Sequence, residues 1–378
     1  MRTTRILALA AVGVLGGALA ACSADPADDT AGATGGPIAV KASDTTCDVA
    51  RNTIDAGTSV FSITNGGNKV TEFYVYAAGD RVMGEVENIA PGLSRELHVE
   101  LPAGSYETAC KPGMIGKGIR SALTVSGSSA PLTDDAALAD ATASYSRYVK
   151  SQTDALLVKT TEFVAAVKAG KVDEAKALFP ITRTYWERIE PVAEIFGDLD
   201  PRIDGREEVT EEGLKFGGFH RIEKDLWIDK STAKSGPIAD QLLLDVKEIV
   251  TKAQAEKLSP LQLANGAKAL LDEVATGKIT GEEDRYSHTD LWDFNANVEG
   301  SKAAIAALRP VLEERDAALV KTLDTEFANV DAALTKYRSG DGWKLHNELT
   351  EADLKGLSDA INALAEPISK VAAVVSQK

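Results

Sequence analysis

The chain has 378 residues, of which 44% are hydrophobic and 26% charged, and its formal net charge is −16. This length provides enough apolar side chains for two or three buried cores. The acidic charge repels phosphate, which argues against DNA or RNA binding and favours cations as partners, although most of these charges are typical of solvated helix faces.

The chain begins with the pattern of an export signal. Arg2 and Arg5 precede an apolar run rich in Gly and Ala, which is too short for a confident membrane span. The run ends in Leu-Ala-Ala-Cys22, which resembles a bacterial lipobox and implies removal of residues 1–21 and lipidation of Cys22. An ordinary signal peptide with a chance cysteine is the alternative. Residues 22–37 are small, acidic and rich in Gly and Pro, so we expect a flexible tether to the outer face of a bacterial cell membrane.

Residues 38–128 predict a small all-β sandwich. Apolar and polar residues alternate, and the β-rich runs of TSVFSITNGGNKVTEFYVYA flank the turn signal NGGN. An oxidising compartment favours a disulfide between Cys47 and Cys110. Alternatively, both cysteines join Glu72 and Met114 in a second metal site. CKPGM is similar to a cupredoxin ligand loop but contains no histidine, so a type-1 copper centre is not expected.

Residues 129–378 predict an all-α, bundle-like domain. The first helix is expected within residues 134–171, with acidic residues at its start and a glycine near its end. Gly, Pro and Asp or Ser separate most of the later helices. One boundary is expected between residues 290–315 and 316–338.

His220 and Glu223 lie in GGFHRIEKDLW, three positions apart, and therefore share a helix face. An imidazole and a carboxylate make a reasonable pair of metal ligands, although a histidine hydrogen-bonded to a nearby acid is at least as common.

Glu187 and Glu190 also share a face, and an acidic loop that contains Asp204 follows them. Pro191 removes a backbone donor, which should kink the helix and free the carbonyl of Glu187. Crowded carboxylates raise one another's pKa unless a cation neutralises them. The alternative is a solvated face on which the two glutamates pair with nearby arginines, among them Arg183.

The segments WERIEPVAE, DLDPRIDGRE, FHRIEKDLW and YSHTDLWDFNANVEGSK resemble the imelysin-type domain of the EfeO family. The lipobox, the β-region and the order of segments are similar too, so the resemblance covers residues 38–378. It implies a cupredoxin-like domain followed by a helical HxxE domain. It also implies the extracytoplasmic iron-binding component of the EfeUOB system, with an EfeU permease and an EfeB haem peroxidase as partners.

The metal ligands that this resemblance implies are His220, Glu223, Glu187, Glu190 and Asp204. Residues Tyr286, Asp290 and Asp293 of the last segment form a supporting shell or, alternatively, cap and pack a helix.

A site with one imidazole and several carboxylates suits Fe(III) and also accepts Fe(II), with zinc or copper as further alternatives. We therefore expect a non-enzymatic iron-binding protein. One alternative is a zinc metallopeptidase, but Lys224 stands where the inverted zinc motif requires a second histidine. The other is a carbohydrate-binding surface lipoprotein, for which the low aromatic content of 6% offers little support.

Overall fold

The computed structural model describes residues 36–197 and 199–377, and residues 37–378 form one compact unit. The predicted signal peptide (1–21), the lipidated Cys22 and nearly all of the tether lie outside the described residues. Within the described ranges, no helix is both long and apolar enough to span a membrane.

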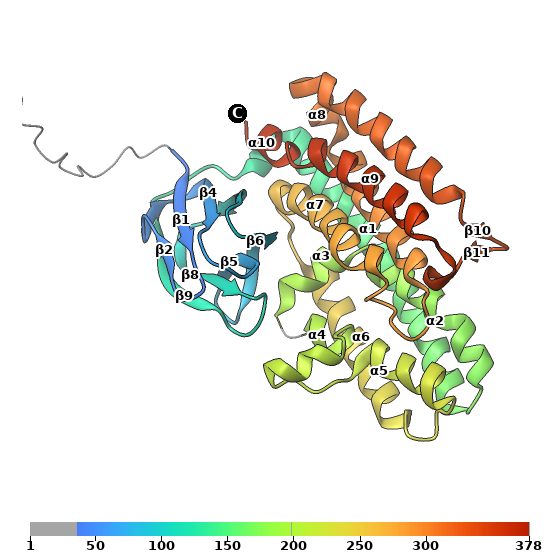
Figure 1. The fold of residues 1–378 in the computed structure, drawn as a ribbon. Helices are drawn as coiled ribbons and strands as arrows, with labels where there is room; N and C mark the ends of the chain where they lie inside the picture. Colours follow the sequence, from blue (N-terminus) through green and yellow to red (C-terminus); the bar gives the residue numbers. More distant parts are fainter. Residues whose placement is uncertain (1–35, 198, 378) are drawn as a thin grey trace, which may run out of the picture. The chain divides into compact units, whose positions relative to one another are not determined.

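The N-terminal region is a sandwich of two β-sheets (Figure 1). The first sheet has the order β2-β1-β4-β7, from Cys47–Val49, Ile38–Ala42, Gly57–Asn65 and Ser94–Leu101. The second has the order β3-β9-β8-β5-β6, from Thr53–Asp55, Ile119–Ser126, Gly104–Pro112, Thr71–Ala77 and Arg81–Ile89. Strand β5 is buried on both faces rather than alternating between buried and exposed residues: Phe73 and Val75 enter the sandwich core, and Glu72 and Tyr74 lie on the other face.

The NGGN turn connects two sheets and does not close a hairpin, because β4 and β5 belong to different sheets. The Asn65 side chain donates to the carbonyls of Lys69, at 2.8 Å, and Ile89, at 2.7 Å. Asp44 Oδ1 accepts a hydrogen bond from Asn68 N at 2.9 Å. These side-chain hydrogen bonds stabilise the crossing of the chain from one sheet to the other. The turn residues alone did not distinguish this crossing from a hairpin.

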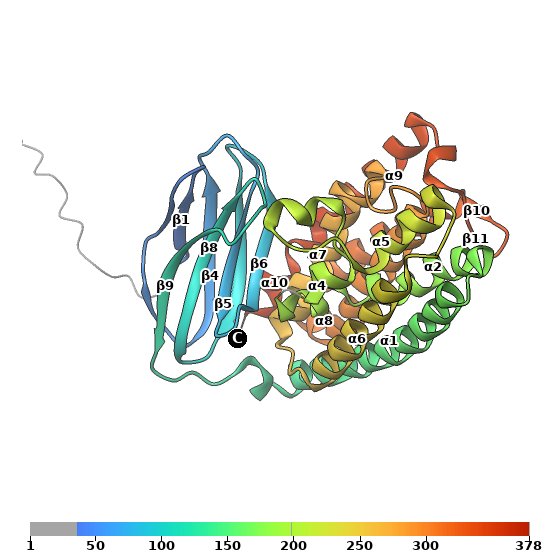
Figure 2. The same cartoon turned by 90° about the horizontal axis from the view of Figure 1, so that it is seen from below.

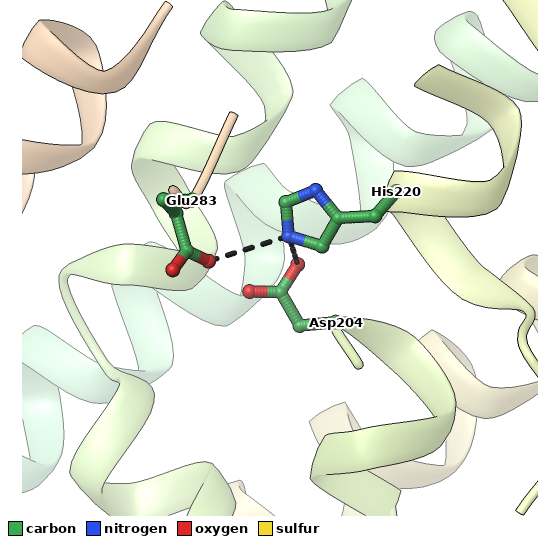
Figure 3. Close-up of side chains that lie close together, drawn as sticks. All are labelled: Asp204, His220 and Glu283. Carbon is green, nitrogen blue, oxygen red and sulfur yellow. Dashed lines mark hydrogen bonds and ion pairs between the residues drawn. The ribbon is translucent and has the colours of Figure 1, made fainter. Parts of the chain in front are cut away.

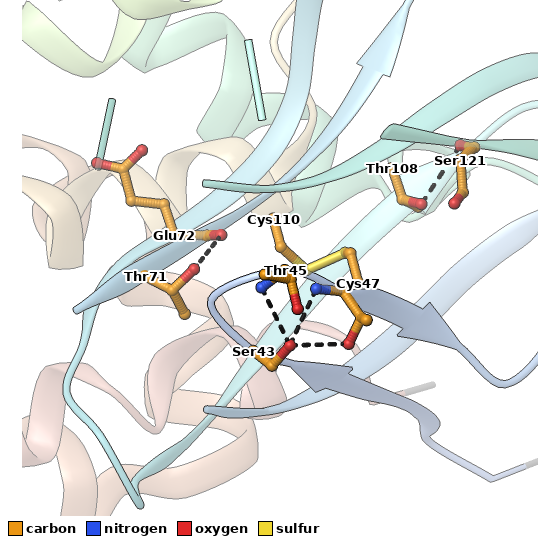
Figure 4. The surroundings of a disulfide bond; sticks show 9 residues. Ser43, Thr45, Cys47, Thr71, Glu72, Thr108, Cys110 and Ser121 are labelled. Atoms are coloured by element: carbon orange, nitrogen blue, oxygen red, sulfur yellow. Dashed lines mark hydrogen bonds between the residues drawn. A yellow bond between two sulfur atoms is a disulfide. The ribbon is translucent and has the colours of Figure 1, made fainter. Parts of the chain in front are cut away.

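A disulfide joins Cys47 of β2 to Cys110 of β8, with a Cα–Cα distance of 5.5 Å, and so links the two sheets. Of the two alternatives for these cysteines, the structure contains the disulfide, so neither sulfur is a free thiolate. Figure 4 shows the Glu72 carboxylate pointing away from the sulfur atoms, on the other side of its strand. Glu72 and Met114 instead line a cavity that is described below.

The remainder of the chain is helical. Its elements are η1 (Leu132–Asp134), α1 (Ala136–Lys168), α2 (Val172–Glu187), α3 (Glu190–Ala193), η2 (Glu194–Phe196), α4 (Leu199–Ile203), η3 (Glu207–Glu212), α5 (Gly218–Lys224), the π-helical turn η4 (Asp225–Asp229), α6 (Gly236–Ala255), α7 (Pro260–Thr276), η5 (Lys278–Thr280), α8 (Asp290–Thr335), the short strands β10 (Arg338–Ser339) and β11 (Gly342–Trp343), η6 (His346–Glu348), α9 (Glu351–Ile368) and α10 (Val371–Val375). Figure 2 shows α6 alongside α1.

Local signals in the sequence mark several of these boundaries. Asp135 caps α1 by accepting hydrogen bonds from Ala137 N and Leu138 N, and Gly170 follows the helix with a φ of 74°. Asp316 has φ −155° and ψ 77°, which breaks α8 at the predicted boundary between residues 290–315 and 316–338.

Pro191 starts a new helix rather than kinking an existing one. Helix α2 ends at Glu187, and Pro191 lies in the first turn of α3, where its missing N–H costs nothing. The carbonyl of Glu187 is free of a helical partner, as predicted, and accepts a hydrogen bond from Asn297 Nδ2 at 2.9 Å. The kink that we expected is therefore wrong in form, while its consequence for this carbonyl is confirmed.

The sandwich and the helices contact each other directly. Helix α7 packs on β6 and β7, and Asn265 Nδ2 donates to the carbonyl of His98 at 2.8 Å. Arg81 pairs with Glu256, and Glu100 Oε1 accepts a hydrogen bond from Leu132 N at 2.7 Å.

Candidate metal centre

A buried cluster of charged side chains lies where α2, α3, the end of α4, α5, η5 with the segment after it, and the start of α8 meet. Its members, all less than a tenth exposed, are Arg183, Glu187, Glu190, Asp204, His220, Glu223, Lys278, Glu283, Asp284, Asp290 and Asp293. The alternative that Glu187 and Glu190 belong to a solvated helix face is therefore wrong.

The glycine pair before His220 allows α5 to start against the backbone that leads to Asp204. Gly218 has a φ of 63°, and a Cβ there would lie 2.0 Å from the carbonyl oxygen of Ile203. Only glycine tolerates both the conformation and the approach. The close contact between these two segments brings His220 next to Asp204.

His220 makes polar contacts with carboxylates through both ring nitrogens. Its Nε2 lies 3.3 Å from Glu283 Oε1 and 3.5 Å from Asp204 Oδ1, as Figure 3 shows. Its Nδ1 lies 3.0 Å from Glu223 Oε2. Two carboxylates thus face Nε2, whereas Glu223 holds the opposite side of the ring.

Glu223 has the contacts of a residue that orients the imidazole. While its Oε2 contacts His220, its Oε1 accepts hydrogen bonds from Tyr286 N at 3.0 Å and Ser287 N at 2.7 Å. A carboxylate with both oxygens engaged in this way typically fixes the ring position of a neighbouring histidine.

Asp204 connects two groups of potential ligands. Ligand atoms of Asp204, His220 and Glu283 lie within 4.8 Å of one another, and so do those of Glu187, Glu190 and Asp204. A third group, within the same distance, consists of His220, Glu223 and Asp284. The five predicted ligands therefore lie in one cluster, but Glu223 does not share a group with the two glutamates of the preceding helices.

Two buried cations neutralise part of this charge. Arg183 forms ion pairs with five carboxylates, those of Glu187, Asp204, Glu283, Asp284 and Asp293. Lys278 Nζ lies 3.3 Å from Glu187 Oε2, 3.5 Å from Glu190 Oε2, 3.3 Å from Glu273 Oε2 and 3.7 Å from Glu283 Oε2.

Burial and charge shift several pKa values in this cluster. Burial and the neighbouring Glu187 raise the pKa of Glu190 well above its usual range, and burial also raises the pKa of Glu187. For Glu283, burial is outweighed by Lys278, Arg206 and His220, which hold its pKa well below the usual range. For His220, burial and Arg183 act downward, but Asp204 and the bonds to Glu223 and Glu283 raise the pKa to about 10.

Sequence reasoning missed Glu283, Asp284 and Lys278, and it considered Arg183 only as a partner of the two glutamates on a solvated face. Glu283 and Asp284 belong to the acidic run GEED directly before the RYSHTDLWDF segment, which was the available signal. Lys278 offered no such signal, because a lone lysine after a helix is usually solvated.

Of the predicted supporting residues, Asp290 and Asp293 belong to the buried cluster itself, and Tyr286 lies beside it. Asp293 Oδ2 accepts from Arg183 Nε at 3.1 Å, and Asp290 Oδ1 accepts from Asp284 N at 3.1 Å. Tyr286 contacts Glu223 through its backbone, while its hydroxyl donates to Glu207 Oε2 at 2.8 Å.

In chemical terms, the cluster combines several buried carboxylates with one imidazole. Carboxylate oxygens are hard ligands, and the set suits a hard, highly charged cation. Within the described residues, His220 is the only histidine of the cluster, whereas helical zinc peptidases use two.

Comparisons with known proteins agree with the architecture. Residues 141–371 match the family model of imelysin, whose name places it among peptidases, and residues 9–125 match the model of the cupredoxin-like domain. The iron uptake system component EfeO of Escherichia coli O157:H7 is 41% identical over 348 residues, which span 89% of this chain and 91% of the relative. The proteins of the same name in E. coli strain K12 and Shigella flexneri are 40% identical over the same shares.

Proposed function

Because the chain belongs to the EfeO family, we propose that it captures an iron cation outside the cell membrane and delivers it to a membrane iron permease. The curated relatives are named as iron uptake components. The observation that carries the proposal is the buried carboxylate and imidazole cluster, whose charge is only partly neutralised.

The proposed ligands are Glu187, Glu190, Asp204, Glu283 and Nε2 of His220. Asp204 belongs to both groups that these residues form, which supports a single binding position. Glu223 is proposed as the residue that holds the imidazole, because both of its oxygens are already engaged.

Arg183 and Lys278 are proposed to keep the metal-free protein folded. Uncompensated carboxylates in a buried site would repel one another, and the two cations offset this repulsion. When iron binds, its charge replaces theirs in part. Such an exchange favours a trivalent over a divalent ion, so Fe(III) is the preferred cargo and Fe(II) the second choice.

The remaining elements of the proposal concern location and partners. We propose residues 1–21 as a signal peptide, Cys22 as the lipid-bearing residue and 22–37 as the tether. The lipid would hold the protein near an EfeU-type permease and an EfeB-type haem peroxidase, which raises its local concentration there. Mass spectrometry of the membrane-extracted protein tests the anchor, since an unmodified Cys22 contradicts it.

The metal proposal is tested by titrating the full chain with ferric citrate, anaerobic Fe(II) and Zn(II). Glu187→Gln combined with Asp204→Asn should weaken iron binding roughly a hundredfold or more, because each charged contact contributes about 1.5–3 kcal/mol. The matched control is Asp245→Asn. Asp245 is equally buried, at 2% exposure, but pairs with Arg202 outside the cluster.

Equal iron affinity in the double variant and in the parent would overturn the ligand assignment. Tighter binding of zinc than of ferric iron would overturn the choice of cargo. A parallel assay of peptide hydrolysis with zinc separates transport from the peptidase alternative, for which the name of the imelysin model is the only support.

A further inference from the structure

A second acidic site lies at the contact between the sandwich and the helices. A cavity of about 340 Å³ is bounded by β5, β6 and the loop after β8 on one side, and by α3, η2, α4 and neighbouring segments on the other. Among the described residues that line it, nine are acidic, and Arg206 is the only basic one. Glu190, Asp204 and Glu283 belong both to this cavity and to the metal centre.

The sandwich contributes two carboxylates to the cavity, Glu72 from β5 and Glu87 from β6. Glu72 is only 4% exposed, and among the described residues its Oε2 accepts no hydrogen bond. The nearest cation is Lys111 Nζ, 3.6 Å away. A deeply buried carboxylate oxygen without a hydrogen bond is costly, and at this position it faces a space lined by other acids.

Glu87 is fixed by a tyrosine on the same face. Tyr74 Oη donates to Glu87 Oε1 at 3.0 Å, which leaves the second oxygen of Glu87 for another ligand. Glu72 and Tyr74 are two residues apart on β5, so both point away from the sandwich core. The face of a β-sheet that packs against another domain is normally apolar, and two carboxylates here need a reason.

The helices contribute Glu194 from η2 and Asp200 from α4. Burial and the nearby acids Asp204 and Glu273 raise the pKa of Asp200 to about 8. Burial and the neighbouring Glu85 also raise the pKa of Glu194 well above its usual range. Among the described residues that line the cavity, Arg206 is the only cation beside the acids, so their charge is compensated only in part.

We propose that this cavity is a second binding site for a hard metal cation, held jointly by Glu72 and Glu87 of the sandwich and Glu194 and Asp200 of the helices. On the path of the cation, this site precedes the metal centre, because the two sites share three carboxylates along one wall. Glu208 and Ile115 at its rim are exposed, whereas Asp204 and Glu283 at its inner end are buried. The choice of a hard cation as ligand rests on the proposed function, but the existence of a second site does not.

The test uses Tb(III), a hard trivalent ion whose luminescence is sensitised by a nearby tyrosine. The full chain should bind two Tb(III) ions. In a background with Glu187→Gln and His220→Gln, which do not line the cavity, one ion should remain. Tyr74→Phe in that background should keep this ion but lose most of its tyrosine-sensitised emission.

The second site itself is removed by Glu87→Gln combined with Glu194→Gln. Both changes preserve size, and they should weaken binding of the remaining ion at least about tenfold. Glu256→Gln is the matched control, because Glu256 also pairs across the two domains, with Arg81, but lies outside this cavity. It should leave Tb(III) binding unchanged.

The two proposals fail in different ways. If the parent binds one ion and Glu87→Gln/Glu194→Gln changes nothing, the second site is refuted and the metal centre stands. If the background variant binds both ions as the parent does, the metal centre is refuted instead. Emission that survives Tyr74→Phe places the remaining ion elsewhere and also refutes the second site.

Discussion

Replacing Lys278 by methionine should destabilise the metal-free protein strongly. Lys278 is 1% exposed, and its ammonium contacts four carboxylates at 3.3–3.7 Å. Each contact corresponds to about 4–5 kcal/mol of attraction at an effective dielectric constant of about 20. Desolvation of the ammonium offsets much of this sum, so we expect a net loss of about 3–5 kcal/mol, as for buried pairs that lose one partner.

Tryptophan fluorescence measures this loss in the relevant domain, because all four tryptophans lie within residues 129–378. For a domain of this size, the expected loss lowers the melting temperature by about 6–20 °C. The control is Lys268→Met, which removes a partly exposed partner of Asp272 and should cost less than about 1 kcal/mol.

The deficit of Lys278→Met should depend on pH and on metal. The raised pKa of Glu187 and Glu190 means that acidification neutralises them and relieves their repulsion, so the deficit should be smaller at pH 5 than at pH 8. Saturating iron should also reduce it, since the ion supplies the missing charge. Equal melting temperatures for Lys278→Met and Lys268→Met at pH 8 would refute the role of this lysine.

Four further changes test other parts of the structure. His220 has its pKa raised to about 10, so it stabilises the metal-free fold fully below about pH 6.5 and less as the pH rises toward 10. His220 must lose its proton before it can bind a metal, so the affinity of the protein for iron should rise with pH. Calorimetry of iron binding in two buffers should show that His220→Gln releases about one proton fewer than the parent. Glu223→Gln should weaken iron binding about 10–100-fold in the same titration, because the imidazole loses its orienting partner; unchanged affinity would contradict this. Gly218→Ala should lower the free energy of unfolding of the helical domain by at least about 2 kcal/mol, as measured in denaturant. An unchanged free energy of unfolding would show that the backbone contact between Gly218 and Ile203 can rearrange to accept a side chain. Cys47→Ser combined with Cys110→Ser should cost the sandwich about 4 kcal/mol for a link across 63 residues, as measured by urea unfolding followed by circular dichroism.

Local patterns in the sequence predicted the two domain classes and the close pairs within the site. Alternation with a period of two marks β7, and the spacing of three marks His220 with Glu223. The freed carbonyl of Glu187 follows from Pro191, four positions further along the chain, because proline has no N–H to donate to it. Each of these inferences needs only a few neighbouring residues, because backbone geometry alone sets which side chains share a face.

Contacts between segments that are distant in the chain could not be predicted from these local patterns. The spacing of His220 and Glu223 suggested two ligands for one ion, yet the backbone donors of Tyr286 and Ser287 engage Glu223. These donors lie more than sixty residues away along the chain. Glu72 shows the same limit, since its partners across the cavity belong to another domain.

The sequence by itself therefore determined the kinds of side chain in the candidate site and the segments that carry them, since residue type and periodicity are local properties. Only the tertiary structure decided which carboxylates meet, because that depends on how helices and sheets pack. It placed Glu283 against His220, and it buried Arg183 and Lys278 among the acids. A buried cation and a solvated one look alike in a sequence, and packing alone makes the first a counter-ion of the buried carboxylates.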